Sequence, residues 1–174
     1  MAQSQQADNS AAFIPIHPEL EYDGNSPYGT LVITFSRDGG DDILEPIQRY
    51  TLHTYKVIFN IDFTQPNKLT PTERAKIGRR IIKIRDAINY VAPGAPITSN
   101  KIRAVEVLVN MHHFSTWRLK SCAGIAELRP TWRLLWQING GAPRHFYTSE
   151  KDVVVDFDQA INDYAQRKNL PNEM

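Results

Sequence analysis

Five stretches of the chain are predicted to be strands, either because they are rich in β-branched and aromatic residues or because hydrophobic and polar residues alternate, as in strands that bury one face. The clearest stretch is 52–63, where aromatic and β-branched residues take every second position from Tyr55 onward, with polar residues such as Lys56 and Asp62 between them. The other four stretches are 28–36, 102–110, 114–120 and 131–138. Such alternation is typical of antiparallel sheets that leave one face in water, so an antiparallel sheet is predicted.

A helical period replaces the alternation over 71–91. Four isoleucines recur at spacings of four, three and four residues, which gives one apolar stripe. They are Ile77, Ile81, Ile84 and Ile88. Thr70 suits the N-cap, Pro71 the first helical position and Glu73 the third position of a capping box. The pattern therefore predicts a helix over 71–91 that buries its isoleucines.

The order of these elements favours an α+β fold, with a mainly antiparallel sheet of about five strands, one long basic amphipathic helix and a C-terminal helix. The C-terminal helix is expected from about 158 to 168, whereas 152–157 fits either a strand or a helix. Residues 1–27 are predicted to be a flexible N-terminal arm, because prolines oppose regular pairing and chain ends are often poorly ordered. Residues 28–174 are then a single globular domain.

Composition narrows the class of protein. Hydrophobic residues make up 41% and charged residues 22% of the 174 residues, which is the range of globular proteins. The formal net charge of +1 gives little general attraction to nucleic acid or anionic lipid. No apolar run is long enough to span a membrane and no signal peptide is expected, so any membrane contact is predicted to be peripheral.

Few residues offer catalytic or metal-binding chemistry. His112 and His113 are neighbours, so at a strand end they point to opposite faces, and no further ligand accompanies them at zinc spacing. Cys122 would need a base such as His145 and a lowered pKa to act as a nucleophile, and a buried inert thiol is expected instead. The sequence therefore predicts no catalytic residue, no metal and no cofactor.

The helix predicted over 71–91 has the strongest functional signal. It carries six basic residues against two acidic ones, and most of them lie opposite the isoleucines. Like charges at helical spacing repel, so this arrangement lowers stability slightly and predicts a surface for an anionic membrane or nucleic acid. The six residues are Arg74, Lys76, Arg79, Arg80, Lys83 and Arg85. Of these, Lys76, Arg79, Arg80 and Lys83 are expected to be exposed.

Tryptophans beside basic residues give a second signal. Trp117, Trp132 and Trp136 fall within predicted strands, next to arginines. Core packing is the expected role, because a tryptophan buries a large apolar area. An exposed one would instead offer a stacking platform for RNA bases.

The N-terminal arm carries three apolar residues, Phe13, Ile14 and Ile16. Pro15 and Pro18 are expected to hold this stretch extended and to keep it out of its own sheet. Leaving apolar surface in water is unfavourable by about 25 cal/mol per Å². The arm can then fold back onto its own domain or insert into a groove of another copy. We predict insertion, a head-to-tail contact that can build open arrays.

The plan of the chain resembles the matrix proteins of plant rhabdoviruses, the short cytorhabdovirus type in particular. The resemblance covers about 28–168 and lies in chain length, in the polar proline-bearing arm and in strands packed with a basic helix. The corresponding segments are 54–63, 71–91 and 102–110. It implies a non-enzymatic viral structural protein of the virion and of membranes in the host cytoplasm. Such a protein binds itself, the viral nucleocapsid or its RNA, and an anionic membrane surface.

Under this resemblance the arm is the self-association segment, and the basic helix faces membrane or nucleocapsid. The chain departs from many matrix proteins in lacking the PPxY, P[TS]AP and YPxL motifs that recruit budding machinery. Two other classes stay open. One is a small RNA-binding module or silencing suppressor that uses the same helix and an exposed tryptophan. The other is an enzyme built around Cys122 and a histidine.

Overall fold

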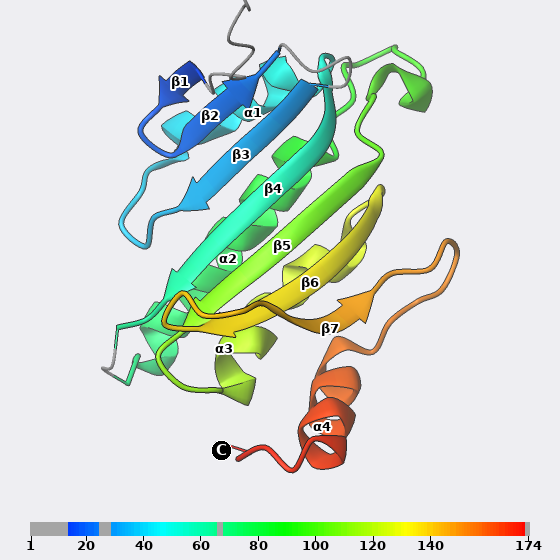
Figure 1. Cartoon of the computed structure of the whole chain (residues 1–174). Helices are drawn as coiled ribbons and strands as arrows, with labels where there is room; N and C mark the ends of the chain where they lie inside the picture. Colours follow the sequence, from blue (N-terminus) through cyan, green and yellow to red (C-terminus); the bar gives the residue numbers. More distant parts are fainter. Residues whose placement is uncertain (1–13, 25–28, 66–67, 173–174) are drawn as a thin grey trace, which may run out of the picture.

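The computed structural model describes residues 14–24, 29–65 and 68–172, and these form one mixed sheet with helices packed behind it (Figure 1). Within these residues, seven strands lie side by side in the order in which they occur in the sequence. They are β1 (Ile14–His17), β2 (Leu20–Asp23), β3 (Gly29–Phe35), β4 (Thr54–Phe63), β5 (Ala104–Met111), β6 (Thr131–Ile138) and β7 (Arg144–Thr148). Strands β3 to β6 are parallel, and the outer strands add on in antiparallel fashion.

The helices are α1 (Leu44–Tyr50), α2 (Pro71–Ile88), α3 (Thr116–Lys120) and α4 (Phe157–Arg167), with short 3₁₀ turns η1 (Asp41–Ile43), η2 (Ile97–Ser99) and η3 (Ala123–Glu127). In Figure 1, α1 and α2 lie behind the sheet, and α3 and α4 lie below its lower edge. Tyr164 of α4 accepts a hydrogen bond from Trp136, so α4 packs on the same side of the sheet. Parallel strands that follow one another in the same direction are joined by right-handed crossovers, and each such crossover lies on the same side of the sheet. The order of the strands therefore leaves the other side without helices.

The local signals in the sequence of α2 are confirmed. The Thr70 hydroxyl accepts a hydrogen bond from the Glu73 backbone N–H, and the Glu73 carboxylate accepts one from the Thr70 backbone N–H. All four isoleucines of the predicted stripe are buried, with at most 3% of any side chain exposed. The helix ends at Ile88, three residues before the predicted end at 91.

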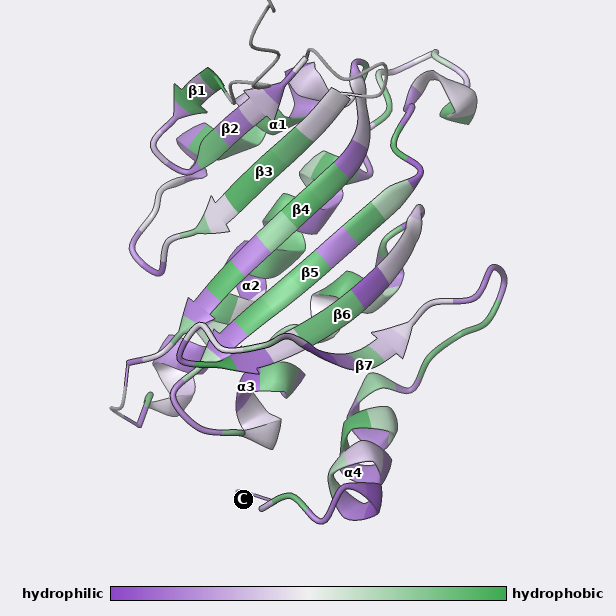
Figure 2. Cartoon of the chain, viewed as in Figure 1, coloured by the Kyte–Doolittle hydropathy of each residue, from purple (hydrophilic) through white to green (hydrophobic). Residues whose placement is uncertain are grey.

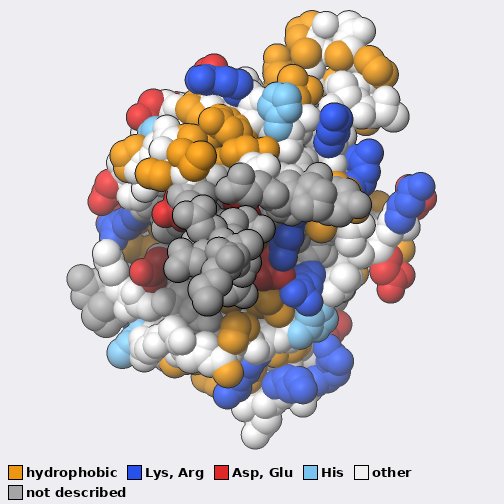
Figure 3. Space-filling model, turned by 45° about the horizontal axis from the view of Figure 1, so that its top comes forward, with side chains coloured by type: hydrophobic (Ala, Val, Ile, Leu, Met, Phe, Trp, Pro, Cys, Tyr) orange, Lys and Arg blue, Asp and Glu red, His pale blue; other side chains and the backbone are white. Residues whose placement is uncertain are grey.

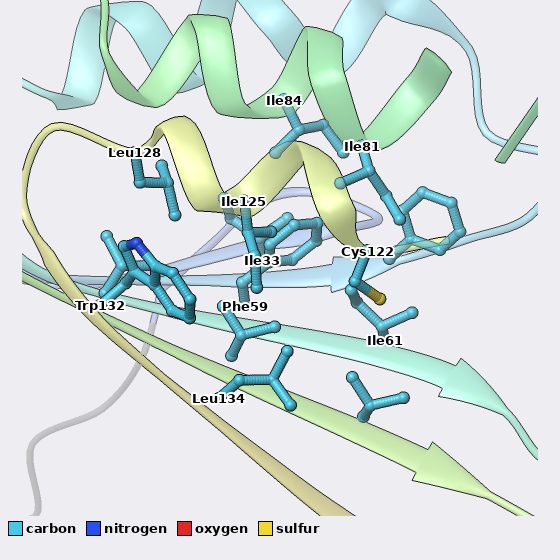
Figure 4. Packing of buried hydrophobic residues seen from close by; sticks show 14 of the residues in the cluster. Ile33, Phe59, Ile61, Ile81, Ile84, Cys122, Ile125, Leu128, Trp132 and Leu134 are labelled. Carbon is cyan, nitrogen blue, oxygen red and sulfur yellow. The ribbon is translucent and has the colours of Figure 1, made fainter. Parts of the chain in front are cut away.

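The two faces of the sheet have different compositions. Residues that point toward the helices are apolar and buried, among them Ile33, Phe59 and Leu134 (Figure 4). Residues that point the other way are half-buried or exposed, and they mix aliphatic and polar types (Figure 2). We call these the covered face and the bare face.

The predicted fold class is wrong. The sheet is mixed and has seven strands rather than about five, and the alternation ascribed to antiparallel strands belongs to parallel ones with a bare face. The predicted strand 114–120 is instead the helix α3, and residues 152–156, which fitted either type, form neither. The short helix α1 and the strands β1, β2 and β7 were not predicted.

Part of the predicted arm belongs to the sheet. Strand β1 pairs with β2, and β2 with β3, so Pro15 and Pro18 do not keep this stretch from pairing as expected. Pro15 is tolerated because β1 is an edge strand, where a missing N–H removes no ladder hydrogen bond. The side chain of Ile14 is 59% exposed, whereas Ile16 packs against the core. Phe13 lies outside the described residues.

Candidate functional site

Arg80 shows how far the basic helix departs from its prediction. This arginine was expected on the exposed face, but 7% of it is exposed, so that expectation is wrong. Its guanidinium donates to the Glu19 carboxylate at 2.8 Å and to the backbone carbonyl of Ser36 at 2.8 Å. A Cβ on Gly39 would lie 2.3 Å from the same guanidinium, so a glycine there leaves room for it. Arg80 is therefore a structural residue.

Two more of the six basic residues are also engaged within the fold. Arg85 is 12% exposed and pairs with Glu127 at 2.7 Å and with Asp86. Arg74 is half-buried, and its guanidinium lies 5.6 Å from the centre of the Trp117 ring. Neither presents its charge freely to a partner.

The exposed basic residues of α2 are Lys76, Arg79 and Lys83. Lys83 pairs with Asp41, whereas Lys76 and Arg79 make no hydrogen bond or ion pair within residues 14–24, 29–65 and 68–172. The structure thus brings three of the six predicted residues together on one surface, which we call the basic surface. It is smaller than the sequence predicted.

The bare face is the larger surface that sequence reasoning did not single out. Aliphatic side chains cross four strands there, because strand register pairs Val32 with Ile58 and Leu108 with Leu135. Polar residues flank this band on the same face, and they include Thr34, Asn60, Asn110 and Gln137. Ile58 lies opposite Glu106, and Leu108 lies opposite Asn60, so aliphatic and polar side chains alternate across the middle of the face.

Charges on the bare face are unevenly placed. Glu106 on β5 accepts a hydrogen bond from Arg133 on β6 and lies 3.7 Å from the Lys56 ammonium on β4. The bond from Arg133 is the main cause that lowers the pKa of Glu106, and the charge of Lys56 adds to it. Glu21, exposed on β2, lies at the other end of the same cross-strand row. The row is acidic at β2 and carries an arginine at β6.

The thiol of Cys122 is unsuited to nucleophilic chemistry. It is fully buried, and burial raises its pKa to about 12, so the thiolate is not populated near neutral pH. His112 and His113 are exposed, and their rings lie edge to face at 5.9 Å. Among the described residues no group of three or more potential ligands surrounds them or any other point.

The tryptophans do not form a stacking platform. Trp132 and Trp136 are 2% and 1% exposed, so the expectation of core packing is confirmed for both. Trp117 is half-buried, with the guanidinium groups of Arg74 and Arg118 over its ring. The exposed tryptophan required by the RNA-binding alternative is therefore missing from the part of the chain that the structure describes.

A cleft of about 640 Å³ opens near the starts of β5 and β6. Its walls come from the segment after α2, from residues 126–132 and from residues 149–155. Ile97 and Val153 line it and are 69% and 50% exposed. Figure 3 looks onto this end of the sheet, where hydrophobic side chains gather in patches among basic and acidic ones. The sequence signal was the valine run 153–155, which lies in the stretch that fitted either a strand or a helix.

No family model, curated protein or solved structure matches this chain. Among the described residues, no helix is both long and apolar enough to cross a membrane. The function must therefore be argued from the bare face, the basic surface and the cleft themselves.

Proposed function

We propose that the chain is a non-enzymatic structural protein that self-associates through the bare face of its sheet. A single observation carries the proposal: four parallel strands have a helical layer on one face alone. Parallel sheets are almost always covered on both faces, and a second sheet packed about 10 Å away is one such cover. The resemblance to rhabdovirus matrix proteins agrees with an assembling protein and makes a viral matrix role part of the proposal.

The arrangement of charges supports a second copy as the cover. A two-fold axis that lies between two such sheets and runs along β4 places β2 of each copy over β6 of the other. Glu21 of one protomer then lies across from Arg133 of its partner, and each contact occurs twice. Between these two contacts Ile58 faces the same residue of the partner, and Val32 faces Glu106 of the partner, which keeps its own ion pairs with Arg133 and Lys56. The charges at the two ends of this row are thus complementary between the two copies.

Sedimentation velocity of the full chain over a range of concentrations tests this proposal. The parent should form dimers as its concentration rises. Leu108→Lys should keep the chain folded and monomeric, because it puts a charge in the centre of the interface, where charged residues are depleted. Gln166→Lys is the matched control, since it adds the same charge on the exposed surface of α4, away from this face.

Charge reversal sharpens the test. Glu21→Arg should weaken the dimer, and adding Arg133→Glu to it should restore part of the affinity. A chain shortened to 14–174 should still dimerise, which separates the bare face from docking by the predicted arm. A parent that stays monomeric at its highest soluble concentration, or a Leu108→Lys variant that dimerises like the parent, overturns the proposal.

The basic surface supports a second role, binding to an anionic membrane or to RNA. Lys76 and Arg79 are exposed, and no described residue pairs with them, so their charges are available. Each basic residue near an anionic membrane contributes about 1 kcal/mol. Replacing Lys76, Arg79 and Lys83 by Glu should reduce binding to phosphatidylserine vesicles or to RNA steeply at low salt. Arg167→Glu on α4 is the control, and unchanged binding by the triple variant rules this surface out.

A further inference from the structure

We infer that the cleft at the starts of β5 and β6 binds an amphiphilic anion, a hydrocarbon chain that ends in an acidic head. This site is separate from the bare face and from the basic surface, so it does not depend on the proposed function. Its volume of about 640 Å³ falls within the usual range for small-molecule sites, about 300–1,000 Å³.

The floor of the cleft is apolar. Ile102, Leu128 and Trp132 line it and are 3%, 7% and 2% exposed, and they continue into the core shown in Figure 4. Val91 and Val155 add aliphatic surface at the sides. Such a floor favours a hydrocarbon chain, because burial of apolar surface is worth about 25 cal/mol per Å².

A hydrogen-bond donor, the indole N–H of Trp132, belongs to a residue that lines this floor. The indole N–H of Trp136 donates to the Tyr164 hydroxyl at 3.0 Å, whereas the indole N–H of Trp132 donates to no described residue. Figure 4 shows that the nitrogen of Trp132 is on the side of its ring nearest Leu128, another cleft residue. An oxygen atom of a ligand in the cleft is a suitable acceptor for this N–H.

The rim favours an acidic head. Arg129 and Lys151 line the cleft and are exposed, and neither side chain makes a hydrogen bond or ion pair within the described residues. Arg103 adds a third cation, which donates to backbone carbonyls. The acidic lining residues are Glu150 and Asp152, so basic residues outnumber acidic ones by three to two. A carboxylate or phosphate head gains charge-assisted hydrogen bonds from this rim.

The exposed wall residues fit the same ligand. Ile97 and Val153 line the mouth of the cleft, although apolar side chains of this size are usually buried. A hydrocarbon chain lying between them would cover both. Apolar residues at the mouth and an apolar floor give the hydrocarbon of the ligand one continuous apolar path.

Isothermal titration of the full-length protein with sodium decanoate, below its critical micelle concentration, tests the inference. Decanoate should bind with one-to-one stoichiometry, whereas acetate and decyltrimethylammonium should bind at least about tenfold more weakly, since one lacks the chain and the other the acidic head. Arg129→Gln should weaken decanoate binding about tenfold, and Trp132→Phe about fivefold. Arg167→Gln, which lies outside the cleft, should bind like the parent.

The inference is overturned if decanoate does not bind at millimolar concentration, or if the cationic amphiphile binds equally well. Unchanged affinity in both Arg129→Gln and Trp132→Phe would also overturn it, by placing the ligand elsewhere. A second experiment identifies the source of the chain. If decanoate displaces the protein from phosphatidylserine vesicles, the site takes its chain from a bilayer, and if it does not, the site takes a free acid. Leu108→Lys should bind decanoate normally, which keeps this test independent of the dimer.

Discussion

The covered and bare faces of the sheet come from alternate residues of the same strands, yet they follow different rules. On the covered face nearly every side chain is apolar and fully buried, and a charge that enters this layer, Arg80, is paired with Glu19. On the bare face the Lys56, Glu106 and Arg133 cluster keeps part of each side chain in water. The comparison indicates that the covered face supplies most of the stability of the fold, so the side chains of the bare face can adapt to a partner.

The largest expected difference between the faces concerns their ion pairs. Arg80→Met leaves the Glu19 carboxylate buried without its partner, so it should lower the free energy of unfolding by about 3–5 kcal/mol. Arg133→Met leaves Glu106 beside Lys56 and water, so it should lower it by at most about 1 kcal/mol. Urea unfolding of dilute protein measures both. Adding Glu19→Gln to Arg80→Met should recover part of the loss, and equal effects of the two arginine changes would contradict the comparison.

A neighbouring pair of leucines on β6 gives the next test. Leu134 is fully buried on the covered face, and Leu135 is half-buried on the bare face. Leu134→Ala should lower the free energy of unfolding by about 2–5 kcal/mol. Leu135→Ala should lower that of dilute monomer by less than about 1 kcal/mol, because little apolar area leaves water there. Thermal unfolding at low concentration compares them.

The leucine comparison becomes sharper at high protein concentration. If the bare face forms the dimer, Leu135→Ala should then lose additional stability, whereas the deficit of Leu134→Ala should not change. A deficit for Leu135→Ala that is large in dilute protein would show that something already covers this face in the monomer.

Sequence patterns predicted which residues face the core better than they predicted the topology of the sheet. The alternation in 52–63 correctly separated a buried face from a wet one, but alternation does not record the direction of neighbouring strands. Parallel strands usually read as continuous apolar runs because both faces are covered. Here one face is bare, so parallel strands carry an antiparallel signature. The direction of the strands depends instead on the helical crossovers between them. The first crossover helix, α1, is too short to show a clear helical period.

The sequence predicted only part of the candidate site, and the rest was missed for a similar reason. A helical wheel places Arg80 near Lys76 and Lys83, and it cannot show that Glu19 lies behind this part of the helix. Their sequence separation is 61 residues, so only the fold joins them. The cleft could not be predicted either, because its walls come from three separate connections. Capping and the isoleucine stripe were predicted correctly because they depend on residues within one helix.

The smallest expected effect is a dependence of stability on pH. It should appear for a carboxylate of the bare face and not for an apolar residue of the covered face. Hydrogen bonding from Arg133, and then the charge of Lys56, lower the pKa of Glu106 in the folded protein. A carboxylate with a lowered folded pKa stabilises the fold above its unfolded pKa, and that contribution is lost as pH falls through the folded value. Glu106→Gln should therefore lower the free energy of unfolding by less than about 1 kcal/mol at pH 7. The difference from the parent should shrink as the pH falls below about 4.5 and vanish in more acidic solution. Leu134→Ala is the control, because its deficit arises from packing and should be the same across this range. Urea unfolding at a series of pH values measures both, and a Glu106→Gln deficit that persists unchanged in acid would show that the ionised carboxylate is not its cause.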